Sequence, residues 1–266
     1  MKKSTLILAG LGSFLLTSFT QLPANLLVKV LPANLPFQID GISGTLWHGA
    51  ANSLSFQQWQ FNQVRWQLKP AALLKGQLAI QLQAQPAQGG KLDGDCGMSF
   101  TQTIHCHPLN LTELPADAVT PYLQQFMVPA LKGTLQVNLA DVTWDRKTPP
   151  LASGHAEWQQ AGVQIDPQTF GNYTAILSVG DEHNQQIQIS SAPDANYQLD
   201  GSIKLQANGQ YNTNLNLKPN QTNNAMVTTF LNSLLGVAQP DGSYLINRQG
   251  QLGAKAAATP PNPSNP

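Results

Sequence analysis

The chain has 266 residues, with 14 lysines and arginines against 14 aspartates and glutamates, so its formal net charge is zero. Charged residues make up 11% of the chain, less than half of the roughly 25% in an average soluble domain, and glutamine plus asparagine take their place at roughly fifty positions. A nucleic-acid-binding surface needs clustered positive charge to displace counterions from phosphates, and this balance excludes it. A hydrophobic content of 41% excludes a protein with many membrane spans.

The N-terminal segment is apolar and uncharged from Ser4 to Leu22. A helix of that length spans about 28 Å, close to the ~30 Å hydrocarbon core of a bilayer. Because Lys2 and Lys3 precede the segment, the positive-inside rule keeps the N-terminus in the cytoplasm and the rest of the chain outside it. A cleaved signal peptide is the alternative, but the segment has no clear small-residue cleavage site. We therefore predict an uncleaved anchor.

The predicted organisation has three parts. Residues 1–30 form a short cytoplasmic N-terminus and a transmembrane anchor, and residues 31–252 form a domain outside the cytoplasm. Residues 253–266 contain several prolines and no apolar periodicity, which predicts a disordered tail.

Apolar and polar residues alternate along most of the chain after Pro36, as in the segments 77–83, 134–139 and 211–217. Such alternation is typical of half-buried antiparallel strands, which turn one face to a core and the other to water. A parallel sheet would need long amphipathic helices between its strands, and the sequence has none. We predict a mainly β fold: a curved antiparallel sheet or sandwich-like domain with one or two short helices.

Two stretches are predicted to be helical. The segment 116–126 contains Pro121, which limits it to a short, kinked helix. The segment 225–235 carries one apolar stripe and ends before Gly236, a suitable C-cap. We expect both helices to cover sheet edges or an open core, where strand backbone groups would otherwise lack partners.

The two cysteines, Cys96 and Cys106, lie ten positions apart in a stretch typical of a β-hairpin. In an oxidising compartment they would form a disulfide, which would contribute about 2–3 kcal/mol for so short a loop. Two free thiols are one alternative, and a metal site with His105 and His107 is another. On a strand both histidines point away from the face of Cys106, and no second ligand pair is present, which argues against a metal.

No catalytic signature is present in the sequence, neither a nucleophile elbow, nor a phosphate-binding loop, nor a zinc-protease motif. The run Asp93-Gly94-Asp95 resembles the start of a calcium loop, but no glutamate follows at the required distance. The tryptophans could form a platform for carbohydrate or lipid, although in β folds they more often fill the core; they are Trp47, Trp59, Trp66, Trp144 and Trp158. We predict no enzymatic activity, no metal, no cofactor and no small-molecule substrate.

Several ordered landmarks resemble one protein family. Residues 41–49 read Gly-Ile-Ser-Gly-Thr-Leu-Trp-His-Gly, similar to that family's Gly-x-x-Gly-Thr-Leu-Trp-x-Gly signature. The family is protein N of the type II (general) secretion pathway, and the resemblance extends over residues 1–252. The positions that carry it are Gly44, Thr45, Leu46, Trp47, Gly49, Trp66, Trp158, Gly209, Tyr211, Gly242 and Tyr244. The two cysteines and the richness in glutamine and asparagine depart from the family pattern.

The resemblance implies a single-pass inner-membrane protein with its bulk in the periplasm. Its implied role is to help assemble or stabilise the machine that exports folded proteins across the outer membrane, with protein C or the secretin as possible partners. The motif residues would then be structural. The alternative is a membrane-tethered β-groove protein that binds or transports lipid in the periplasm, because alternation does not reveal whether the apolar face is closed into a core or open to acyl chains.

Overall fold

A computed structural model of the chain describes residues 13, 17–26, 37–56, 59–123, 129–164, 169–220 and 225–252. The first strands are β1 (Phe37–Asp40), β2 (Ser43–Gly44), β3 (His48–Phe56), β4 (Trp59–Lys69), β5 (Gln77–Pro86), β6 (Lys91–Ser99) and β7 (Ile104–Pro115). The others are β8 (Leu131–Trp144), β9 (Leu151–Val163), β10 (Gly171–Val179), β11 (Gln185–Ser191), β12 (Tyr197–Leu205), β13 (Gln210–Pro219) and β14 (Tyr244–Gln251). The helices are α3 (Pro70–Leu73), η1 (Ala116–Val119), α4 (Thr120–Leu123), η3 (Asp181–His183) and α5 (Ala225–Leu235).

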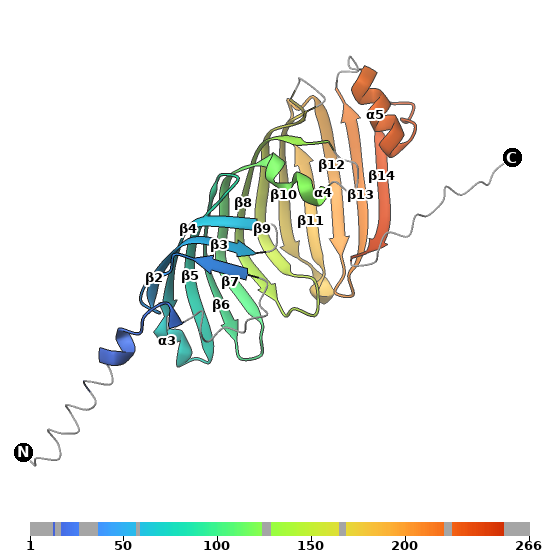
Figure 1. Cartoon of the computed structure of the whole chain (residues 1–266). Coiled ribbons are helices and arrows are strands. Elements are labelled where there is room, and N and C mark those ends of the chain that lie inside the picture. Colours follow the sequence, from blue (N-terminus) through green and yellow to red (C-terminus); the bar gives the residue numbers. More distant parts are fainter. Residues whose placement is uncertain are drawn as a thin grey trace, which may run out of the picture.

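All described strands belong to one 14-stranded antiparallel sheet, in which strand order follows chain order from β1 and β3 to β14, with β2 paired beside β3. Figure 1 shows this sheet twisting along its length, so that β3 and β4 cross the view at a steep angle to β12 and β13. The mainly β, antiparallel architecture with a few short helices is thus confirmed. The described strands form a single open sheet, and a sandwich would require two.

One face of the sheet is apolar from strand to strand. Leu68 pairs with Ile80, Ile80 with Cys96, Cys96 with Cys106, and Cys106 with Val142, so these five side chains form a row across β4 to β8. Directly paired residues in an antiparallel sheet point to the same side, and the register therefore carries the apolar face across strand boundaries.

The opposite face is polar. Gln67 pairs with Gln81, and Gln81 with Asp95, one position away from the apolar row on each strand. Lys69 forms an ion pair with Asp95 on this face, between two partly exposed side chains. Neutral amides and a few balanced charges therefore solvate this side, as expected from the low charge content.

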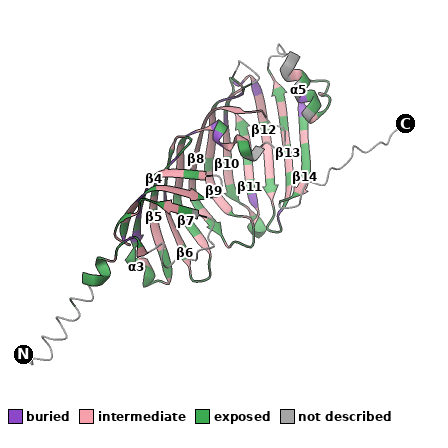
Figure 2. Ribbon diagram, viewed as in Figure 1, coloured by how far each residue is buried: buried purple, intermediate pink, exposed green. Residues whose placement is uncertain are grey.

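Buried positions are few (Figure 2), and two clusters of them lie near the two ends of the sheet. Other buried residues, including Leu114, Ala161 and Tyr173, lie on the strands between these clusters. The cluster near the N-terminal end comprises Ala24, Trp47, Ala51, Val64, Trp66, Leu68 and Ala84. The cluster near the C-terminal end comprises Tyr197, Leu231 and Tyr244, and is covered by α5. Between them, apolar residues of β8 such as Leu135, Val137 and Leu139 are only half-buried.

The predicted helices have mixed outcomes. α5 occupies the predicted segment 225–235, and the segment 116–126 is helical over η1 and α4 as far as Leu123. The short helix α3, which begins at Pro70, is not among the predicted helices. β2 ends at Gly44 and β3 begins at His48, so residues 45–47 connect the two strands.

Most of the predicted anchor and all of the predicted tail after residue 252 lie outside the described residues. Within the described part of the chain, no helix has the length and apolar character needed to cross a bilayer.

Candidate functional site

The Gly-Thr-Leu-Trp motif holds the N-terminal segment against the sheet. The indole Nε1 of Trp47 donates a hydrogen bond to the carbonyl oxygen of Phe19 at 2.8 Å, and the two rings lie 4.7 Å apart between centroids. The backbone N–H of Leu46 donates to the carbonyl oxygen of Leu22 at 2.7 Å. The motif therefore fixes residues 19–22, which form the end of the apolar segment 4–22.

A tight turn gives the motif its shape. Gly44 has φ +84°, and a Cβ there would lie 2.5 Å from the carbonyl oxygen of His48, so only glycine fits. The N–H of Thr45 donates to that same oxygen at 2.9 Å, and the N–H of His48 donates back to Thr45 Oγ1 at 3.1 Å. Ala24 donates its N–H to the Gly44 carbonyl at 3.1 Å, which extends the contact with the N-terminal segment.

The second motif glycine makes room for a tryptophan. A Cβ at Gly49 would lie 2.1 Å from the ring of Trp66, its cross-strand partner. The Trp66 ring consequently lies over the bare backbone of Gly49, and its Nε1 donates to the carbonyl oxygen of Leu46 at 3.2 Å. The indole N–H groups of Trp47 and Trp66 thus both donate to backbone carbonyl oxygens.

These elements enclose an open groove of ≈ 890 Å³ on the apolar face. Every lining residue is apolar: Phe19, Leu22, Leu26, Ile39, Ile42, Leu46, Trp47, Ala51, Leu54, Phe56, Phe61, Val64, Trp66, Leu68, Leu73, Leu78, Ile80, Leu82, Ala84 and Leu92. We call it the N-terminal groove. Phe19, Phe56, Leu73 and Leu78 keep 40–50% of their surface exposed, so the groove is open to its surroundings.

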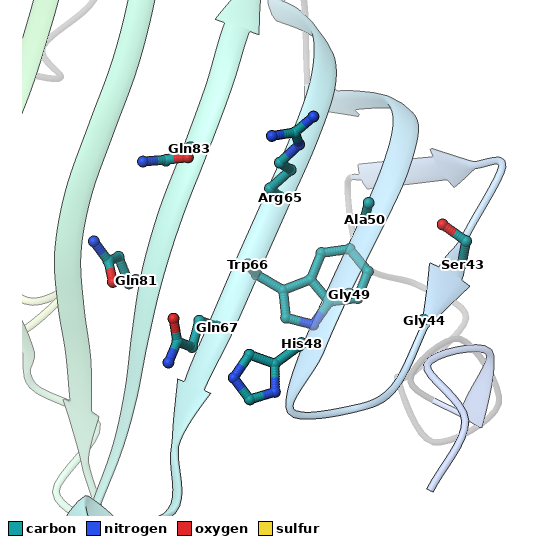
Figure 3. Close-up of a pocket in the computed structure, with 10 residues that line it drawn as sticks. All are labelled: Ser43, Gly44, His48, Gly49, Ala50, Arg65, Trp66, Gln67, Gln81 and Gln83. Atoms are coloured by element: carbon teal, nitrogen blue, oxygen red, sulfur yellow. The ribbon is translucent and has the colours of Figure 1, made fainter. Parts of the chain in front are cut away.

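The polar face behind the groove has a shallow hollow of ≈ 520 Å³ (Figure 3). Arg65 and Gln67 of β4 and Gln81 and Gln83 of β5 lie side by side there, with His48 near the end of the strands. These side chains offer amide and guanidinium hydrogen bonds but no carboxylate. The hollow is therefore suited to weak polar contacts and lacks an acid–base pair.

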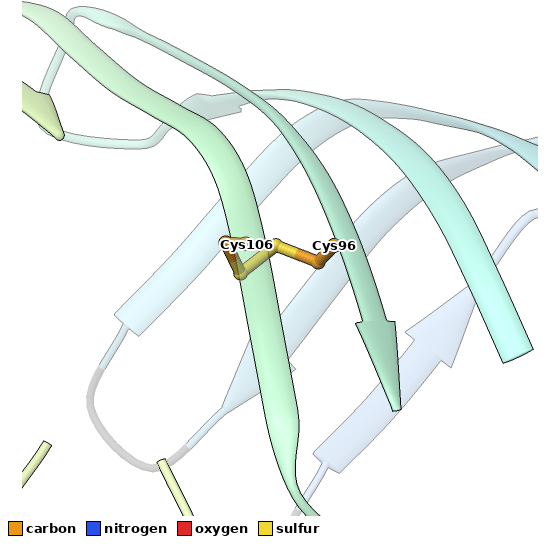
Figure 4. Close-up of a disulfide and its surroundings, with 2 residues drawn as sticks. All are labelled: Cys96 and Cys106. Atoms are coloured by element: carbon orange, nitrogen blue, oxygen red, sulfur yellow. A yellow bond between two sulfur atoms is a disulfide. The ribbon is translucent and has the colours of Figure 1, made fainter. Parts of the chain in front are cut away.

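Cys96 and Cys106 form a disulfide between directly paired positions of β6 and β7 (Figure 4). His105 and His107 flank Cys106 but make other contacts: His105 Nδ1 lies 3.3 Å from Thr143 Oγ1, and His107 Nδ1 lies 2.9 Å from Asp141 Oδ1. Among the described residues, no cluster of three or more His, Cys, Asp or Glu could hold a metal ion.

The remaining motif residues lie at a distance from the groove. Trp158 of β9 donates its Nε1–H to the carbonyl oxygen of Lys132 at 2.8 Å, and its ring lies 5.9 Å from that of Tyr173. The hydroxyl of Tyr173 donates to the carbonyl oxygen of Tyr197 at 2.7 Å. Burial raises the pKa of Tyr173 above its ordinary value, so its hydroxyl stays protonated as a structural donor.

The last motif positions shape the C-terminal hairpins. Gly209 and Gly242 have φ of +84° and +80° in tight turns. Tyr211 lies over Gly250, where a Cβ would be 2.6 Å from its hydroxyl, and the Tyr244 hydroxyl donates to Asn232 Oδ1 of α5 at 2.9 Å. These structural contacts explain why glycine or tyrosine occupies each of these positions.

Two carboxylates have lowered pKa values for local reasons. The N–H groups of Thr148 and Lys147 and the Thr148 hydroxyl hold the pKa of Asp145 below its ordinary value. The hydroxyl and N–H of Ser243 do the same for the pKa of Asp241. Both carboxylates accept hydrogen bonds from residues two or three positions further along the chain, so their shifts indicate local turn capping and not catalysis.

The structure therefore brings together one part of the predicted set, namely Gly44 to Trp47, Gly49 and Trp66. Sequence reasoning missed the partners of this group, Phe19 and Leu22, because it assigned them to the membrane segment alone. A signal was present: two aromatic motif residues with indole N–H groups need acceptors when buried.

Comparisons with known proteins agree on one family. The sequence profile described as "Type II secretion system (T2SS), protein N" matches residues 36–247. The type II secretion system protein N of Vibrio cholerae is 24% identical, over 91% of this chain and 96% of its own length. The protein of the same name from Aeromonas hydrophila is 26% identical, over 95% of this chain and 100% of its own length. No solved structure matches significantly.

Proposed function

The chain belongs to the type II secretion system protein N family, and on that premise we propose that it is a non-catalytic inner-membrane component that helps assemble or stabilise the secretion machine. In this proposal residues 1–30 carry the anchor, the β domain of residues 31–252 is periplasmic, and residues 253–266 form a solvated tail. The cargo of the machine is folded protein destined to cross the outer membrane.

The observation that carries the proposal is the clamp between the motif and residues 19–24. Trp47 and Leu46 hydrogen-bond to Phe19 and Leu22, and Ala24 hydrogen-bonds to Gly44. A sheet fixed this closely to the end of an apolar segment would keep a defined height and orientation over the bilayer. Fixed placement is what an assembly component requires.

The ends of the sheet offer a way to bind other components. Among the described strands β1 pairs only with β3, and β14 only with β13, so one edge of each has unpaired backbone groups. Edge strands can accept a strand from a partner protein through main-chain hydrogen bonds. Protein C and the secretin are the partners we propose to test first.

A secretion assay tests the role. We expect deletion of the gene to leave exported enzymes folded but retained in the periplasm, and a photo-crosslinker placed at Asn247 of β14 to capture another secretion component. Full secretion in the deletion strain would contradict the proposal. A crosslinker at Gln188, on the polar face of the interior strand β11, is the matched control.

The clamp can be tested separately. Trp47→Phe keeps an aromatic ring, smaller than the indole, but removes the hydrogen bond to Phe19, and we expect secretion to fall while the sheet stays folded. Trp144→Phe is the control, since its Nε1 donates only to the nearby carbonyl of Thr148 at 3.1 Å. Equal secretion by both variants would show that the clamp has no part in the role.

The topology also needs a direct test. An alkaline phosphatase fused after residue 60 should be active, and the membrane-extracted protein should keep Lys2 at its N-terminus. A soluble periplasmic protein that begins near Gln21 would overturn the anchor.

A further inference from the structure

We propose that the N-terminal groove binds an acyl chain of an inner-membrane phospholipid, with the headgroup left outside at the rim. The site goes beyond a role in assembly, and its position beside the bilayer rests on the anchor proposed above.

The lining offers nothing to a polar ligand. The only polar side-chain atoms among the lining residues are the indole nitrogens of Trp47 and Trp66, and both donate to backbone carbonyls, of Phe19 and Leu46. A soluble metabolite or a polar peptide would lose its hydration without gaining hydrogen bonds here. An aliphatic chain loses nothing, because it carries no polar group.

The size and openness of the groove also fit such a chain. Its ≈ 890 Å³ lies within the range of about 300–1,000 Å³ that is typical of ligand pockets. Phe56 and Leu78 are 41% and 45% exposed at its rim. An opening of this kind lets a chain enter sideways while a charged headgroup remains in water.

The position of the groove selects a membrane lipid as the source. Phe19, Leu22 and Leu26 form one wall, and in sequence they end or directly follow the apolar segment 4–22. The mouth of the groove would then face the outer surface of the inner membrane. A phospholipid could lift one chain into the groove without a long passage through water.

Among the described strands, all of which belong to one sheet, none forms a second layer that closes the groove. The apolar row of Leu68, Ile80 and Cys96 continues from the groove floor to Cys106 and Val142. Large apolar surfaces left open on a soluble protein mark a binding site. With an uncharged, wholly apolar lining, an acyl chain matches this surface better than the charged surface of an exported folded protein.

Photolabelling of the full-length protein tests the site. The probe is a phosphatidylglycerol with a diazirine in one acyl chain, mixed into vesicles of phosphatidylethanolamine and phosphatidylglycerol that contain the protein. We expect the label on peptides of β3, β4 and β5. We also expect single-chain lysophospholipids to compete, with affinity rising roughly fourfold for each added methylene.

Two variants with matched controls decide the outcome. Leu82→Glu places a charge on the groove floor and should reduce labelling at least tenfold, whereas Gln83→Glu, on the opposite face, should not. Leu78→Ser removes a rim side chain without disturbing buried residues and should reduce labelling severalfold. Leu245→Ser, at a position on β14 with nearly equal exposure of 46%, should leave labelling unchanged.

Other results would overturn the proposal. These are labelling spread evenly over β9 to β14, labelling unaffected by Leu78→Ser, preferential capture of a free fatty acid probe, or protection of the groove by a second copy or a partner protein. Binding is measured with purified protein and lipid, so its failure leaves the secretion role standing. Conversely, normal secretion in a deletion strain would not affect lipid labelling.

Discussion

The two ends of the sheet bury their apolar face in different ways. At the N-terminal end, the segment 17–26 and α3 border the N-terminal groove, whose lining residues are all apolar. At the C-terminal end, Leu231 of α5 packs with Tyr197 and Tyr244 of the sheet in one buried cluster. The same alternation of residues underlies both ends. Whether a face becomes a groove or a core therefore depends on the segment that covers it.

The largest expected effect tests the N-terminal end. Trp66→Ala should lower the free energy of unfolding by about 3–5 kcal/mol, because it removes a large buried ring and leaves a cavity. Tyr211→Ala, at the half-buried ring that lies over Gly250, should cost clearly less. Urea denaturation followed by circular dichroism measures both. Equal losses would mean that the two ends do not differ in packing.

Loss of the disulfide should have the second-largest effect on stability. Cys106→Ser should lower the free energy of unfolding by about 2–3 kcal/mol, since a loop of ten residues is no longer closed in the unfolded chain. A reductant should lower the melting temperature of the native protein but not of the variant. Rapid alkylation of both thiols in unreduced, folded protein would rule the bridge out.

Alanine substitutions at two glycines, one near each end of the sheet, compare the packing of the two ends directly. Gly49→Ala places a Cβ 2.1 Å from the buried Trp66 ring, and we expect a loss of about 1–3 kcal/mol from overpacking. Gly250→Ala meets only the far end of Tyr211 at 2.6 Å. That half-buried ring can move aside, so the loss should be much smaller. Thermal melts of both variants would show the opposite order if the C-terminal ring is the more tightly held.

The tyrosine contact of α5 should have a modest effect. Tyr244→Phe removes the hydrogen bond to Asn232 and should cost about 0.5–1.5 kcal/mol. Because the ring stays in place, we expect faster amide exchange in α5 but not in β3 to β5. Uniform acceleration across the sheet would indicate that α5 and the N-terminal half unfold as one unit.

The smallest effect concerns pH. The pKa of Asp241 is held below 3.8 by hydrogen bonds from Ser243, so its carboxylate stabilises the folded state above the ordinary carboxyl pKa, and this stabilisation is lost as the pH falls through the lowered value. Asp241→Asn should lower the melting temperature slightly at neutral pH, and the difference should vanish in acid. A difference independent of pH would assign the effect to packing.

The sequence predicted the strands well because alternation is a local property. Segments such as 77–83 and 211–217 lie within β5 and β13, and α5 has the predicted bounds. The alternation of apolar and polar residues identifies the apolar face of a strand but not the segment that packs on it. The sequence therefore did not distinguish a sandwich from a single open sheet. The answer depends on contacts between distant parts of the chain.

The N-terminal groove also could not be predicted from local sequence patterns. The motif Gly44 to Trp47 was recognised, but its purpose required the contact between Trp47 and Phe19, which are 28 positions apart. The pattern of residues 17–22 also satisfied the simpler interpretation of a membrane segment. Only the paired hydrogen bonds of Leu46 and Trp47 reveal that the end of this segment belongs to the sheet.

The strand order has a consequence for how the molecule forms. From β3 to β14 each strand pairs with the next one in the chain, so strand pairing does not require a partner that is distant in sequence. A polypeptide that emerges with its N-terminus first can add each new hairpin to the growing edge as it arrives. Until the last strand is in place the growing edge is always the newest one, and β14, followed by no further described strand, is where that growth stops.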